Sequence, residues 1–62
     1  MSLEKGDRVV IVGNHPWATS AGELLTWEVM PVIRTKMWRV VLDEGMECYA
    51  KPENIRVMGK AP

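Results

Sequence analysis

The single histidine, His15, is the first residue of this 62-residue chain that could do chemistry. Imidazole titrates near neutral pH and serves as a general acid or base. His15, however, has no second histidine, cysteine or acidic residue within seven positions along the chain. Its neighbour Pro16 favours an extended backbone, which suits a bend. We therefore expect a loop histidine that faces solvent or bonds the backbone.

The remaining reactive groups fit structural roles. Cys48 alternates with apolar residues in MECYA, which favours a small buried side chain over a nucleophile. The adjacent carboxylates Asp43 and Glu44 precede Gly45 and are typical of a turn. Neither a glycine-rich phosphate loop nor a metal-ligand spacing occurs in the sequence. The sequence therefore predicts no enzyme, no cofactor and no metal site within one chain.

The tryptophans and their neighbours point to binding or packing. Trp17, in the loop NHPWATS, could face outward as part of an aromatic groove for an extended peptide. It could also turn inward and cover one end of a small barrel, which is the arrangement that we expect. Trp27 shares its strand parity with apolar Leu25 and Val29, and Trp38 alternates with further apolar residues, so both are predicted to lie in the core.

A cluster of basic residues surrounds Trp38 in the sequence. Cations interleaved with an aromatic ring can hold phosphates and stack a nucleic-acid base. The other interpretation is an edge strand whose charges prevent aggregation between sheets, and we favour it. Nucleic-acid binding stays an alternative that would use Arg34, Lys36 and Arg39.

Composition limits the possible classes. The chain is 47% hydrophobic and 26% charged, which is typical of one small globular domain. Its formal net charge of zero gives no overall field to attract a polyanion. One cysteine permits no intramolecular disulfide, and the longest apolar run, VVIV, is too short for a membrane span or a signal peptide. We expect a cytoplasmic protein with no membrane partner.

The elements that position these residues are short strands. The β-branched run Val9 to Val12 predicts the first strand, because such residues pack well on a pleated surface. Pro31 ends the second strand, and Asp43 to Gly45 form a hairpin. The expected strands are residues 9–12, 22–30, 38–42, 46–50 and 55–58, with a 3-10 turn at residues 51–54. The ordered part would cover residues 4–58, followed by a frayed tail at 59–62.

Four stretches carry a family resemblance: GDRV at 6–9, AGEL at 21–24, WRVVLDEG at 38–45 and PENI at 52–55. Over nearly the whole chain, this order resembles the SH3-like barrel, and within it the KOW-type and related bacterial small barrels. The resemblance implies an all-β fold, in which residues 1–62 form one SH3-like barrel of about five short antiparallel strands with a one-turn 3-10 helix before the last strand.

The resemblance carries two functional implications. KOW-type domains bind RNA, which fits the nucleic-acid alternative. The chain also distantly resembles type II dihydrofolate reductase, a tetramer of short SH3-like chains with a Val-Gln-Ile-Tyr pore motif. The matching stretch here, MECY at 46–49, shares only the tyrosine. Glu47 in place of the glutamine would bring the negative charges of the symmetry-related copies together in the pore. Reductase activity is therefore the third hypothesis.

The leading hypothesis is a non-enzymatic SH3-like module for interaction or assembly, which binds a protein partner or a second copy of itself. The first part of its surface would be the loop at residues 15–20, with His15 and Trp17. The second would be the connection at residues 30–36, where an apolar patch would mark an interface. The candidate residues in that connection are Met30, Val32 and Ile33.

Overall fold

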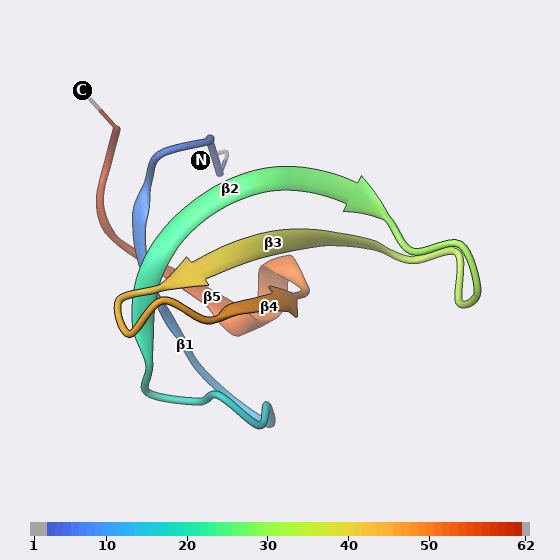
Figure 1. The fold of residues 1–62 in the computed structure, drawn as a ribbon, viewed down its shortest axis with the longest axis horizontal. Coiled ribbons are helices and arrows are strands. Elements are labelled where there is room, and N and C mark those ends of the chain that lie inside the picture. Colours follow the sequence, from blue (N-terminus) through green and yellow to red (C-terminus); the bar gives the residue numbers. More distant parts are fainter. Residues whose placement is uncertain (1–2, 62) are drawn as a thin grey trace.

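The structure, a computed structural model, describes residues 3–61 and is a single antiparallel sheet wrapped around one core (Figure 1). Its strands and one 3-10 turn, in chain order, are β1 (Arg8–Ile11), β2 (Ala21–Val29), β3 (Lys36–Leu42), β4 (Glu47–Ala50), η1 (Pro52–Asn54) and β5 (Ile55–Gly59). The strand order across the sheet is β4-β3-β2-β1-β5. The predicted all-β class, with five antiparallel strands and a 3-10 turn before the last, is confirmed.

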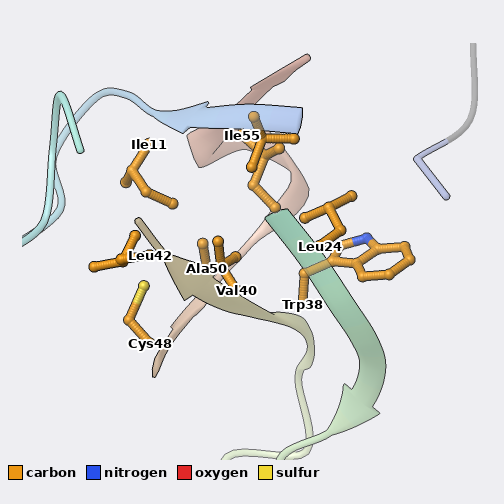
Figure 2. Packing of buried hydrophobic residues seen from close by; sticks show 9 residues of the cluster. Ile11, Leu24, Trp38, Val40, Leu42, Cys48, Ala50 and Ile55 are labelled. Atoms are coloured by element: carbon orange, nitrogen blue, oxygen red, sulfur yellow. The ribbon is translucent and has the colours of Figure 1, made fainter. Parts of the chain in front are cut away.

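The alternation of side chains along β1 and β3 builds the core. Successive strand residues point to opposite faces, so Val9 and Ile11 of β1 lie on the buried face, as Val40 and Leu42 of β3 do. Figure 2 shows Ile11, Val40 and Leu42 among the buried side chains of the cluster. The buried apolar cluster comprises Val9, Ile11, Leu24, Trp38, Val40, Leu42, Cys48, Ala50 and Ile55.

Strand β2 departs from simple alternation at Leu25. Its register against β3 shifts between Leu24 and Thr26, so Leu25 has no partner and forms a bulge. Leu24 therefore pairs with Val40 on the buried face, while Trp27 returns to that same face opposite Trp38. An inserted residue of this kind reverses the parity of every residue that follows it.

The prediction that Trp27 lies in the core is wrong, although the bulge turns its side chain to the buried face, while the prediction for Trp38 is confirmed. Trp38 is 8% exposed, whereas Trp27 is 43% exposed. Trp27 lies beyond the packed core, where it contacts the Trp38 ring with centroids 5.4 Å apart. Trp27 is therefore exposed because it lies past the core near the end of β2, and not because it faces outward.

The predicted turns are present at both ends of β4. Gly45 has a φ of 99°, the left-handed geometry that glycine tolerates, and closes the hairpin between β3 and β4. Beyond β4, Asn54 of η1 donates from Nδ2 to the Val12 carbonyl at 2.8 Å, and the Val12 N–H donates to the Asn54 carbonyl at 2.8 Å. This reciprocal pair ties the 3-10 turn to the chain just after β1.

The expected frayed tail does not hold for residues 59–61, while Pro62 lies outside the described residues. Gly59 completes β5, and the next two residues bind the fully buried Asp7. Lys60 Nζ donates to Asp7 Oδ2 at 2.8 Å, and the Ala61 N–H donates to Asp7 Oδ1 at 2.8 Å. A buried carboxylate needs such partners, which explains why the tail is held against the N-terminal turn.

Candidate functional site

His15 bonds the backbone through both ring nitrogens. The Trp17 N–H donates to Nδ1 at 3.0 Å, and Nε2 lies 2.7 Å from the Tyr49 carbonyl. Because Nδ1 accepts and a carbonyl can only accept, the proton of the neutral ring belongs on Nε2, which donates to Tyr49. This confirms the expected backbone-bonded histidine. His15 joins the loop after β1 to β4 and has neither nitrogen available for a substrate.

Trp17 is half-buried and packs against the core cluster, as expected for a lid. Its loop is closed by backbone bonds: the Thr19 N–H donates to the Ile11 carbonyl at 2.7 Å, and the Ile11 N–H donates to the Ser20 carbonyl at 2.9 Å. Thr19 has a φ of 73°, an uncommon conformation for a β-branched residue. The loop at residues 15–20 is therefore tightly folded against one end of the core.

The connection between β2 and β3 projects from the rest of the molecule and forms one extreme of its long axis (Figure 1). We call residues 29–36 the arm. Its turn is closed by two backbone bonds, from the Arg34 N–H to the Met30 carbonyl at 2.7 Å and from the Met30 N–H to the Thr35 carbonyl at 2.9 Å. Arg34 has a φ of 55° at this turn.

Aliphatic side chains of the arm are exposed to solvent. Val32 is 93% exposed, Ile33 is 59% exposed and Val29, at the end of β2, is 57% exposed, whereas Met30 is half-buried. The structure thus brings three of the candidate residues, Met30, Val32 and Ile33, together on one projecting element. The loop with His15 and Trp17 is a separate element, between β1 and β2.

The three candidate cations do not form one cluster around Trp38. Arg39 points to the face opposite Trp38, where its Nε lies 3.0 Å from Glu28 and its Nη1 lies 3.7 Å from Glu47. Its Nη2 also donates to the Tyr49 hydroxyl at 2.9 Å. The Tyr49 hydroxyl, aided by the two carboxylates, raises the pKa of Arg39. Arg39 is therefore neutralised within the sheet.

The other two cations belong to the arm. Arg34 and Lys36 are exposed, and neither forms an ion pair within residues 3–61. The sequence contains no acidic residue between Glu28 and Asp43. The arm is therefore both aliphatic and positively charged.

Acidic residues gather at the opposite end of the sheet, around the turn between β3 and β4. The exposed acidic residues there are Asp43, Glu44 and Glu47. Glu23 of β2 lies on the same part of the sheet, because it pairs with Val41 of β3, which in turn pairs with Glu47 of β4. Arg8 neutralises Asp43 through two bonds of 2.8 Å and lowers the pKa of that carboxyl. An excess of negative charge remains at this end.

An open hollow that no sequence signal indicated lies where Trp27 and Trp38 meet. It has a volume of about 460 Å³ and is lined by Leu3, Trp27, Trp38 and Pro52. Its walls come from the N-terminal segment, two strands and the 3-10 turn. The sequence does not indicate that Trp27 pairs with Trp38, because this pairing depends on the bulge at Leu25. No sequence pattern links Leu3 or Pro52 to the two tryptophans.

The thiol of Cys48 is buried in the core. Cys48 is 8% exposed, and burial raises the pKa of its thiol. Among residues 3–61, no three histidine, cysteine or acidic side chains gather as metal ligands. Over that same range, the chain forms no helix of the length and apolar character that crossing a membrane requires.

No family model, no curated protein and no solved structure matches this chain.

Proposed function

We propose that this chain is a non-enzymatic SH3-like interaction module that binds a protein through the arm. One observation carries the proposal: three exposed branched aliphatic residues, Val29, Val32 and Ile33, project together on residues 29–36, away from the core. Fully burying a valine or isoleucine side chain contributes about 1.5–3 kcal/mol, so a partner that covers the arm gains several kcal/mol. Exposed apolar groups concentrated in this way are typical of protein interfaces.

The antiparallel five-stranded sheet and the 3-10 turn before β5 support the SH3-like assignment that the sequence resemblance implies. A fold of this kind does not determine a function, whereas the exposed arm indicates an interface. The engaged ring nitrogens of His15 and the buried thiol of Cys48 support a non-enzymatic role.

The arm favours a protein partner over a nucleic acid. Its exposed side chains at 32 and 33 are aliphatic and offer no ring on which a base can stack. Arg39, the third cation of the nucleic-acid hypothesis, is held by Glu28 and Glu47. Arginine beside apolar side chains is, by contrast, enriched at protein interfaces.

Photo-cross-linking in native cells tests this proposal. A photoreactive phenylalanine analogue replaces Val32 at the exposed tip, and a control variant carries the same group at exposed Lys51, outside the arm. We expect a discrete protein adduct from position 32 and only diffuse background from position 51. Equal background from both positions would contradict the proposal, and an adduct with RNA or DNA from position 32 would favour the nucleic-acid alternative.

A further inference from the structure

The two ends of β3 carry complementary surfaces. The arm, at one end, combines exposed Val32 and Ile33 with two unpaired cations, Arg34 and Lys36. The other end is the acidic turn, which we define as Asp43, Glu44, Met46 and Glu47 together with the neighbouring Glu23. Within the acidic turn, Met46 is 46% exposed, and Glu44 forms no ion pair in the described part of the chain.

These surfaces lie far apart in one molecule. Strand β3, from Lys36 to Leu42, separates them, and seven strand residues span roughly 23 Å. Figure 1 shows the arm at one extreme of the long axis and the β3–β4 turn toward the other. The long axis measures 32 Å. Since the two surfaces face outward from opposite ends, the cations of the arm cannot contact the carboxylates of the acidic turn in the same chain.

We propose that the arm docks on the acidic turn of a second copy of this chain, in a head-to-tail contact. The inference rests on the proposed function, because it names the partner of the arm. Arg34 and Lys36 of one copy meet Glu44 and Glu47 of the next, and Val32 and Ile33 cover Met46, whose flexible thioether adapts to aliphatic neighbours.

Charge complementarity is the argument for a second copy. The chain has eight basic and eight acidic residues, yet it keeps unpaired cations at one end and excess carboxylates at the other. A contact between unlike surfaces leaves a free arm at one end of the pair and a free acidic turn at the other. Further copies therefore extend the contact into a ring or an open chain.

Analytical ultracentrifugation with charge-reversed variants tests the inference. One variant carries Arg34→Glu and Lys36→Glu, and a second carries Glu44→Lys and Glu47→Lys. At roughly 20 mM salt, where the Debye length is about 20 Å, we expect the unmodified chain to associate and each variant alone to sediment as a monomer. An equimolar mixture of the two variants should associate again, because each end then meets its opposite charge.

A matched control carries Lys51→Glu and Arg56→Glu, which change the net charge by the same amount as the arm variant but lie outside both surfaces. This control should associate like the unmodified chain. Failure of the unmodified chain to associate, failure of the mixture to recover, or an equal loss in the control would each overturn the inference.

The cross-linking experiment separates this inference from the proposed function. An adduct from position 32 with a mass of two copies supports both. An adduct with a different protein overturns the head-to-tail inference and leaves the interaction function standing. Absence of any discrete protein adduct overturns both.

Discussion

Replacement of Gly22 by alanine is expected to prevent this chain from folding. Gly22 lies in β2 between Val9 of β1 and Leu42 of β3, with both neighbouring strands paired to it. An added Cβ would overlap the Val41 carbonyl oxygen and lie 3.0 Å from the Leu42 Cα. Both contacts are with backbone, which cannot rotate away as a flexible side chain can.

The cost exceeds what a small domain tolerates. Relieving the overlap requires β2 and β3 to separate where they enclose the core. Overpacking costs about 1–3 kcal/mol where side chains can adjust, and more where the backbone must move. A single core of this size has only about 3–5 kcal/mol of stability to lose. We therefore expect Gly22→Ala to lose its dispersed amide NMR spectrum and its cooperative thermal transition.

Gly59→Ala is the matched control. A Cβ at Gly59 would meet only the Arg8 Cβ at 3.8 Å, an ordinary contact, and Gly59 does not need a left-handed backbone. This variant should fold, with a Tm within roughly 5 °C of the unmodified chain. If Gly22→Ala melted cooperatively with a Tm similar to that of Gly59→Ala, the close approach of β2 and β3 at Gly22 would be contradicted.

Asp7→Asn is expected to lower the Tm by roughly 10 °C at neutral pH and to change the acid stability of the fold. The buried carboxylate of Asp7 accepts from Lys60 Nζ and from the N–H groups of Ala61 and Glu4. An asparagine side chain turns one acceptor oxygen into an NH₂ donor, which faces at least one of these donors. The contact that holds residues 60 and 61 is then weakened.

The sign of the pH dependence follows from the pKa of Asp7. The bond from Lys60, followed by the Ala61 N–H, lowers this pKa from its ordinary value of 3.8. A carboxyl group with a depressed folded pKa stabilises the fold fully above the unfolded pKa, and this contribution is lost as the pH falls through the folded value. The Tm difference between the unmodified chain and Asp7→Asn should therefore hold constant above about pH 5 and narrow below about pH 4.

Circular dichroism melting curves from neutral to acid pH measure this difference. Asp43→Asn serves as the control, because Asp43 forms an exposed ion pair with Arg8. Exposed ion pairs contribute little to the stability of a fold, so this control should change the Tm by no more than roughly 5 °C. If Asp7→Asn and Asp43→Asn gave the same small change in Tm at every pH, the stabilising contact of Asp7 with residues 60 and 61 would be refuted.

The sequence predicts the fold wherever the signals are local. The β-branched run Val9 to Val12 and the glycine at position 45 correctly located a strand and a turn, because both depend on backbone preferences of adjacent residues. Cys48 was placed in the core by the alternation of one short strand.

Signals that depend on distant residues were missed. The bulge at Leu25 arises from the register of β2 against β3, so no parity argument on β2 alone could place Trp27. The buried role of Asp7 was also missed, because its partner Lys60 lies 53 positions away in the sequence. Both errors concern pairings that only the folded sheet creates.

The candidate site was predicted in part. The connection at residues 30–36 was predicted to carry an apolar patch, and Val32 and Ile33 prove to be exposed on the arm. Arg39 was grouped with Arg34 and Lys36 by sequence proximity, although alternation along β3 directs it to the opposite face from Trp38, toward Glu28 and Glu47. Separating these cations required the partners on neighbouring strands.

Backbone amide shifts measured by NMR during dilution at low salt test directly whether the arm contacts the acidic turn of a second copy. We expect concentration-dependent shifts at residues 29–36 and 43–47, with the amides of β1 and β5 unchanged. Shifts confined to the hollow around Trp27, Trp38 and Pro52, with residues 29–36 unmoved at every concentration, would contradict it.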